Sequence, residues 1–321
     1  MTVSPLSPPT LAEIRAAAER LRGTALRTPL LPLQLGEAPT PIWLKLENLQ
    51  PIGSFKLRGA GNAMAAASRK ALAGGVYTAS AGNMAQGVAW CARRLGVPAA
   101  VVVPESAPQT KLDAIRRLGG RVVPVPFEEW WQVLVEHRYP GLDGLFIHPV
   151  ADAAVIAGNG TIGLEIVEDL PEVETIVVPY GGGGLSCGIA AAAKALKPGV
   201  RVVAAEVETA APLAASLAAG RPVSIDYRPS FVDGIGGKSL LPEMWPLVQA
   251  LLDGTEVVSL EAVASAIRLL VERQRVVAEG AGAAAVAAAL AGAARGPTVC
   301  VVSGGNLDTA KLATILGGGV P

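Results

Sequence analysis

One lysine stands out in the sequence because of the residues around it. Lys56 follows Gly53, Ser54 and Phe55, which form a probable turn, and the stretch after it has the composition of a helix. A lysine at the start of a helix and shielded from water has a lowered pKa, which makes its amine reactive near neutral pH. Most single lysines are instead exposed surface charges. The context of Lys56 therefore indicates a reactive amine only if other segments of the chain support it.

A run of four glycines supplies part of that support. Gly181, Gly182, Gly183 and Gly184 follow an apolar run and precede a helix that begins near Leu185. Glycine lets successive backbone N–H groups turn toward one centre, and the helix adds its positive end, so the loop suits a phosphate dianion. A simple flexible connection is the alternative. The loop does not form a dinucleotide-binding GxGxxG unit with an acidic residue after the next strand.

Two further strand ends carry small polar residues. The segment Thr78–Gly87 joins a strand to a helix, and Asn83 and the backbone N–H groups there can hold a carboxylate and a ring hydroxyl. Ser303 leaves the late strand in Val301–Asn306. Open α/β sheets bind ligands at the carboxyl ends of their strands, so these ends predict one shared crevice.

The elements that position these residues follow from the apolar pattern. Short apolar runs bounded by Gly, Pro or charged residues predict buried strands at Pro41–Leu46, Gly75–Thr78, Ala99–Val103, Arg121–Val125, Thr175–Pro179, Arg201–Glu206 and Thr298–Val302. Helices are predicted at Leu11–Leu21, where Thr10 and Glu13 form a capping box, and at Met84–Leu95, Gln109–Leu118, Leu185–Leu196 and Ala262–Arg273. This alternation predicts an α/β fold with doubly wound, mostly parallel sheets. The length of 321 residues, without a clear linker, predicts two interleaved domains.

Composition excludes several classes of protein. Lys plus Arg and Asp plus Glu number 27 each, so no excess charge draws the chain to nucleic acid or an anionic membrane. We expect a soluble, cytoplasmic protein, because no leader or apolar run of membrane-spanning length is evident. Cys91, Cys187 and Cys300 are isolated and predict core residues, and His137 and His148 are too few for a metal cluster.

Four segments occur in the same order as the motifs of a known family: SFKLRGA, SAGNMAQG, GGGGLSCG and SGGN. In these segments the chain resembles the fold-type II pyridoxal-phosphate (PLP) enzymes, the tryptophan synthase β family. The chain most resembles the branch of threonine and serine dehydratases (ammonia-lyases) and serine racemases. The similarity runs from about Leu11 to about Asp308. It implies PLP in a crevice between a large domain, residues 1–52 and 148–321, and a small domain, residues 53–147. It also implies a small amino-acid substrate and a homo-oligomer, a dimer or tetramer.

The resemblance assigns roles residue by residue. Lys56 is the catalytic lysine that carries PLP, Phe55 contacts the ring face, Asn83 meets the ring 3-hydroxyl and Ser303 meets the pyridine nitrogen. The remaining assigned residues are Gly181, Gly182, Gly183, Gly184 and Leu185 around the phosphate, Ser80, Ala81, Gly82 and Met84 around the substrate carboxylate, and Gly234 and Glu279 on the other wall. Glu279 receives no definite proton role, and a structural turn or cap is an equal alternative for it and for Gly234.

The implied reaction is β-elimination of water and then loss of ammonia from threonine or serine, with Lys56 removing the Cα proton. Ser303 offers the ring nitrogen only a neutral hydroxyl, which favours elimination over transamination. The alternatives are racemisation, β-replacement and dehydration of a bulkier 3-hydroxy amino acid such as phenylserine. A further alternative is a non-catalytic sugar- or nucleotide-binding α/β protein, in which the glycine-rich loops bind phosphate and Lys56 is only a counter-charge.

The chain departs from the family pattern at three positions. Met84 stands where many relatives have His, which indicates a bulkier or more apolar substrate. Pro212 stands where metal-binding relatives have Asp, beside matching Glu206 and the Ala210 carbonyl, so we expect no high-affinity metal site. Ala81 stands where serine racemases carry an extra Ser, and it cannot deliver a proton, so we expect elimination to predominate over racemisation.

Overall fold

The computed structural model describes residues 6–35 and 40–321. Residues 1–5 and 36–39, which belong to the predicted large domain, lie outside the described part. The described helices include none that is long and apolar enough to cross a membrane.

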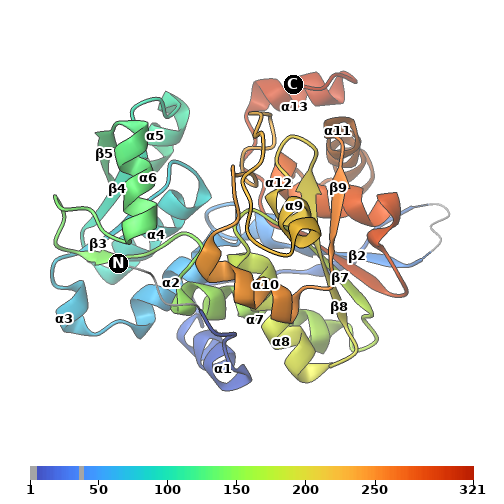
Figure 1. Cartoon of the computed structure of the whole chain (residues 1–321), viewed down its shortest axis with the longest axis horizontal. Coiled ribbons are helices and arrows are strands. Elements are labelled where there is room, and N and C mark those ends of the chain that lie inside the picture. The colour runs from blue at the N-terminus through green and yellow to red at the C-terminus, as the bar shows by residue number, and fades with distance from the viewer. Residues whose placement is uncertain (1–5, 36–39) are drawn as a thin grey trace.

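Two sheets organise the chain into two lobes (Figure 1). The larger sheet has the order β1-β2-β10-β7-β8-β9. Its strands are β1 (Leu30–Pro32), β2 (Ile42–Leu46), β10 (Thr298–Val302), β7 (Thr175–Pro179), β8 (Arg201–Val207) and β9 (Thr255–Val258). The smaller sheet has the order β5-β4-β3-β6, with β5 (Arg121–Val125), β4 (Ala99–Pro104), β3 (Val76–Ala79) and β6 (Leu145–Phe146). Every strand pair is parallel except β1 with β2, so the predicted fold class is confirmed.

The predicted strands at Arg121–Val125, Thr175–Pro179 and Thr298–Val302 agree with the structure to the residue. Three strands were not predicted: β1, β6 and β9. Each is at the edge of its sheet, and each is only partly buried. These three strands have only two to four residues, so they lack the longer apolar run that predicted β5, the remaining edge strand.

Helices cover both faces of the larger sheet. The helical elements are α1 (Leu11–Arg20), η1 (Glu47–Leu49), α2 (Lys56–Ala66), α3 (Arg69–Leu72), α4 (Asn83–Leu95), α5 (Gln109–Arg117), α6 (Phe127–Glu136), α7 (Ala153–Asp169), α8 (Gly184–Leu196), α9 (Pro212–Ala219), η2 (Pro242–Met244), α10 (Trp245–Leu251), α11 (Leu260–Leu269), η3 (Leu270–Gln274), α12 (Gly280–Ala288), η4 (Ala289–Ala293) and α13 (Thr309–Leu316). Strand β10 sends Val299 and Val301 to the core beneath α1, α7, α8 and α10. Its other residues, Cys300 and Val302, enter the core beneath α11, α12 and α13. This alternation accounts for the doubly wound architecture.

Helix α1 begins as the sequence predicts. Thr10 accepts a hydrogen bond from the Glu13 N–H, and the Glu13 carboxylate accepts one from the Thr10 N–H, which completes the capping box. Cys91, Cys187 and Cys300 are buried free thiols, as expected of core residues.

Buried charges fix helix α2, which begins at Lys56. The Arg58 guanidinium is 2% exposed and lies 2.8 Å from the Glu47 carboxylate and 2.6 Å from the Glu165 carboxylate. Lys45 contacts the same Glu165 at 2.6 Å. A buried ion pair is costly to break from one side, so this network ties α2 to β2, η1 and α7.

Candidate active site

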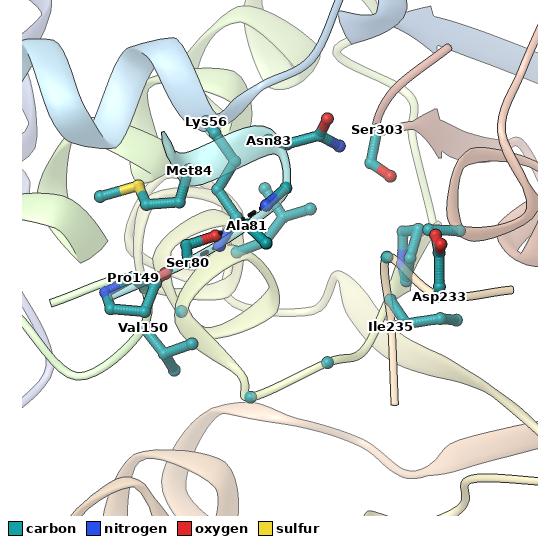
Figure 2. Close-up of a pocket in the computed structure, with 18 of the residues that line it drawn as sticks. Lys56, Ser80, Ala81, Asn83, Met84, Pro149, Val150, Asp233, Ile235 and Ser303 are labelled. Carbon is teal, nitrogen blue, oxygen red and sulfur yellow. Dashed lines mark hydrogen bonds between the residues drawn. The ribbon is translucent and has the colours of Figure 1, made fainter. Parts of the chain in front are cut away.

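A cavity of about 370 Å³ lies between the two sheets, at the carboxyl ends of several strands. It is lined by all of the residues that the sequence predicts for the site: Phe55, Lys56, Ser80, Ala81, Gly82, Asn83, Met84, Gly181, Gly182, Gly183, Gly184, Leu185, Gly234 and Ser303. Figure 2 shows Lys56 and Asn83 on one side and Ser303 and Asp233 on the other. The four segments were predicted to meet because each follows the carboxyl end of a strand or lies at the start of a helix, and the structure brings them together. The role of each residue toward a ligand stays a prediction.

Lys56 is the first residue of α2, and the turn before it is held by the end of β10. The Phe55 N–H donates to the Ser303 carbonyl at 3.0 Å, and Ser54 bridges Gly304. The Lys56 Nζ donates to the Pro149 carbonyl at 2.7 Å. Removal of the ammonium group from water lowers the pKa of Lys56 to about 8, with the Glu279 carboxylate opposing this effect. Near neutral pH a minor fraction of this amine is therefore uncharged, far more than for an ordinary lysine.

Val150 packs closely against Gly182 and Gly184 in the glycine loop. A Cβ on Gly182 would lie 2.7 Å from a Val150 methyl, and one on Gly184 would lie 2.8 Å from the Val150 carbonyl oxygen. Gly183 caps α8 with φ +95°, a conformation that favours glycine. The N–H groups in the first turn of α8 have no acceptor within the helix. The loop thus presents donors without side chains to the cavity.

A chain of hydrogen bonds crosses the cavity at Asn83. Its amide donates to the Glu279 carboxylate at 2.8 Å and accepts from the Asn306 amide at 2.8 Å. Burial raises the pKa of Glu279 to about 7, and the hydrogen bond from Asn83 opposes that shift. Ser303 is 2% exposed and follows β10, and Figure 2 shows the Asn83 amide pointing toward it.

The two sides of the cavity belong to different sheets. We call residues 181–185 with Ser303 the large-sheet wall, since they follow β7 and β10. We call residues 80–84 with Lys111, Phe127 and Trp130 the small-sheet wall, since they follow β3, β4 and β5. A salt bridge of 2.8 Å between Lys111 and Asp233 connects α5 to the loop before Gly234.

Several lining groups had not been predicted. Among them are Pro149, Val150, Lys111, Phe127, Trp130 and Asp233. The sequence signal available for Pro149 and Val150 was their place in the family-like stretch HPVADAAVIAGNGTIGLEI. The other four have no local motif.

His148 shapes the turn that carries Pro149 and Val150. Its Nδ1 accepts the N–H groups of Val150 at 3.0 Å and Ala151 at 2.7 Å. Burial, together with His137 and Lys56, lowers the pKa of His148 to about 3. A neutral ring is required because Nδ1 must keep its lone pair to accept these bonds. His148 is therefore structural, as expected, but it supports the contact to Lys56.

Glu206, which matches a metal-binding position of some relatives, binds the start of a helix in this structure. The Glu206 carboxylate accepts the N–H groups of Leu213 and Ala214, each at 2.8 Å, at the start of α9. It also accepts from the Thr255 hydroxyl at 3.1 Å. Within residues 6–35 and 40–321 no group of three or more His, Cys, Asp or Glu side chains is placed to hold a metal ion.

The chemistry of the cavity fits PLP. The glycine loop provides backbone donors for a phosphate, and the part-buried Lys56 provides an amine for an aldehyde. Ser303 and Asn83 provide neutral polar groups for the ring. Gly182 and Gly184 exclude side chains from the cradle where a phosphate would bind, because Val150 occupies the only space for a Cβ.

Comparisons with known proteins agree with this fit. The sequence profile of the family "Pyridoxal-phosphate dependent enzyme" matches residues 21–305. The chain is 41% identical over 317 residues to an L-threonine ammonia-lyase of Thermotoga maritima, covering 97% of this chain and 79% of that protein. It is 42% identical over 313 residues to an L-threonine ammonia-lyase of Geobacter sulfurreducens, covering 94% and 77%. The structure of maize serine racemase superimposes with a TM-score of 0.90 at 33% identity, covering 96% of each chain.

The match spans both sheets and every segment of the cavity described above. The protein therefore belongs to the family of pyridoxal-phosphate-dependent enzymes, in the branch that contains threonine ammonia-lyases and serine racemases.

Proposed function

We propose that this protein is a PLP-dependent ammonia-lyase that converts a small 3-hydroxy amino acid, such as threonine or serine, to a 2-oxo acid and ammonia. The observation that carries the proposal is the placement of the Lys56 amine, with its lowered pKa, in one cavity with the glycine loop and Ser303. The threonine ammonia-lyases to which the chain is similar support the same reaction.

We assign the site residues as follows. Lys56 carries PLP, Phe55 contacts the PLP ring and Asn83 contacts its 3-hydroxyl. Ser303 contacts the pyridine nitrogen, and Gly234 lies on the far side of PLP. The phosphate is bound by Gly181, Gly182, Gly183, Gly184 and Leu185, and the substrate carboxylate is surrounded by Ser80, Ala81, Gly82 and Met84. The N–H groups at the start of α4 support this carboxylate site, since Gly82 caps that helix without a side-chain acceptor.

Bound PLP supplies the electron sink that lets the Cα proton of an amino acid be removed. Lys56 acts as the base that takes this proton, because its pKa of about 8 makes a far larger uncharged fraction available near neutral pH than an ordinary lysine has. The Pro149 carbonyl orients the amine while it is free. Loss of the β-hydroxyl as water and hydrolysis of the released enamine then give the 2-oxo acid and ammonia.

Racemisation is the second candidate, because relatives of similar length include serine racemases. It needs a second acid on the opposite face of Cα from Lys56. Ala81, which lines the cavity, has no proton to deliver there. We therefore propose that elimination exceeds inversion.

The test is incubation of the PLP-loaded protein with L-threonine and with L-serine. We expect 2-oxobutanoate or pyruvate and an equal amount of ammonia, with little D-amino acid by chiral chromatography. Ala81→Ser should raise the small amount of inversion. Inversion that matches or exceeds 2-oxo acid formation in the unmodified protein would contradict the proposal, as would the absence of either product.

We also propose that residues 1–52 and 148–321 form the large domain and residues 53–147 the small one, in a cytoplasmic dimer or tetramer. Sedimentation of the PLP-loaded protein measures the oligomer, and limited proteolysis locates the domain boundaries.

A further inference from the structure

Three neighbouring strands of the smaller sheet deliver their following residues to the same end of the cavity. Strands β3, β4 and β5 are parallel neighbours. Their carboxyl ends therefore meet along one edge, where the turn 80–84, Ser106 and the first turn of α6 line the cavity. Since we place the substrate carboxylate at 80–84, the groups from the other two strands are available to its side chain.

The first turn of α6 contributes two aromatic rings to this edge. Phe127 and Trp130 are three residues apart, so both lie on one face of the helix, and their ring centroids are 5.5 Å apart. Both line the cavity, and Phe127 is 49% exposed. Trp130 also packs against the core of the smaller sheet, which fixes its position. An exposed phenylalanine at the edge of a binding cavity offers apolar area to a ligand.

Met84 lines the same wall from its buried side. It is 1% exposed and packs in the core with Leu57 and Val88, so it sets the shape of the wall and offers little surface of its own. Val150 and Pro149 complete this part of the lining. Where it contacts Phe127, Pro149 and Val150, a substrate side chain meets carbon atoms, and Ser80 and Ser106 add hydroxyl groups to this edge.

The charges of the cavity disfavour an acidic side chain. The cations among the described lining residues are Lys56, which we assign to PLP, and Lys111, which is paired with Asp233 at 2.8 Å. The lining acids are Asp233, which is paired with Lys111, and Glu279, so the described lining residues carry no excess positive charge to attract a second carboxylate. A side-chain carboxylate would thus be desolvated without an unpaired cation.

We infer that the substrate class is 3-hydroxy amino acids with an apolar β-substituent, aromatic ones included, and that Phe127 and Trp130 determine this specificity. The inference rests on the proposed function and specifies its substrate. The wall should accept threonine, favour phenylserine and reject 3-hydroxyaspartate.

The experiment compares kcat/KM for L-threonine, L-phenylserine and L-3-hydroxyaspartate by ammonia release, which is common to all three. We expect phenylserine to equal or exceed threonine, and 3-hydroxyaspartate to be at least about a hundredfold poorer. Phe127→Ala and Trp130→Ala should each lower kcat/KM for phenylserine about tenfold or more and that for threonine less than about threefold. Trp131→Ala is the matched control, because Trp131 is on the same helix but does not line the cavity.

A second readout uses amino acids that lack the β-hydroxyl and so bind without eliminating water. L-Phenylalanine should inhibit threonine turnover at a concentration at least about tenfold lower than L-alanine or L-aspartate, and Phe127→Ala should abolish this preference. Turnover of threonine but not phenylserine, or equal losses for both substrates in the Phe127 and Trp130 variants, would overturn the inference alone. Ammonia from none of the three substrates would overturn the proposed function with it.

Discussion

The two walls of the cavity are built in different ways. The large-sheet wall follows strands in which every residue is buried, and within it Leu185 is 6% and Ser303 2% exposed. On the small-sheet wall Phe127 is 49% exposed and the Lys111 side chain 37%. Helices α5 and α6 each bury a single residue. Close packing fixes the large-sheet wall before any ligand binds, whereas the small-sheet wall combines the buried Met84 with accessible side chains such as Phe127 and Lys111. We therefore expect changes in the first to affect PLP and changes in the second to affect substrate choice.

The largest effect is expected from substitution of Lys56, which lines the cavity between the two walls. Lys56→Ala should fold, because the segment is held by backbone bonds to β10 and by Arg58. It should lose at least about a thousandfold in ammonia release, since both the attachment point and the base are removed. Borohydride reduction should label the unmodified protein with PLP at Lys56 and leave the variant unlabelled. A reducible PLP adduct in the variant would show that another lysine carries the cofactor.

Gly184→Ala tests the large-sheet wall. Its Cβ would lie 2.8 Å from the Val150 carbonyl oxygen, so the loop must shift at a cost of about 1 to 3 kcal/mol. We expect the Kd for PLP to rise about tenfold or more, while the ratio of kcat/KM for phenylserine and threonine in the PLP-saturated protein stays constant. Gly199→Ala is the control, because a Cβ there has no atom within 4 Å. A changed substrate ratio in Gly184→Ala would break the division between the walls.

Glu279→Gln tests the group that connects the walls through Asn83. Burial raises the pKa of Glu279 to about 7 in the folded protein, against an ordinary value of about 4.3 when unfolded. The folded state therefore binds the extra proton between these pH values, so its unfolding free energy falls as pH rises from about 4.3 to about 7 and then levels off. Glutamine does not ionise, so the variant should gain on the order of 1 to 3 kcal/mol relative to the parent between pH 5 and pH 8. Denaturant unfolding of both proteins at pH 5 and pH 8, at the same PLP concentration, measures this gain in unfolding free energy. The same difference between variant and parent at both pH values would contradict the assignment of Glu279 as a buried carboxyl group with a raised pKa.

Chelation should have the smallest effect. Glu206 is occupied by the N–H groups at the start of α9, and Pro212 has no ligand side chain. Excess EDTA should change ammonia release less than about twofold. Loss of most activity, restored by Mg²⁺ or Ca²⁺, would show that a cation site forms in spite of Pro212.

The parts of this structure that the sequence predicts are those with a local signal. Central strands such as Thr175–Pro179 are continuous apolar runs, and the glycine loop and the Lys56 segment carry short motifs. The pairing of Lys111 with Asp233 spans 122 positions in the chain, and the contact of Lys56 with Pro149 spans 93. Such contacts depend on how the two sheets meet, which no pattern in either segment encodes. The same reason hides Phe127 and Trp130, whose spacing alone indicates only one face of a helix.

The turn at His148 has a consequence for behaviour in acid. It joins the smaller sheet to helix α7, and its ring accepts two backbone N–H groups through Nδ1. An ordinary histidine gains a proton below about pH 6.5 and would then lose both bonds. With a pKa of about 3, His148 keeps a single tautomer, protonated on Nε2, throughout the range in which most histidines titrate. The joint between the lobes is thus acid-resistant, and its Nδ1 should keep the ¹⁵N chemical shift of an unprotonated nitrogen down to pH 5.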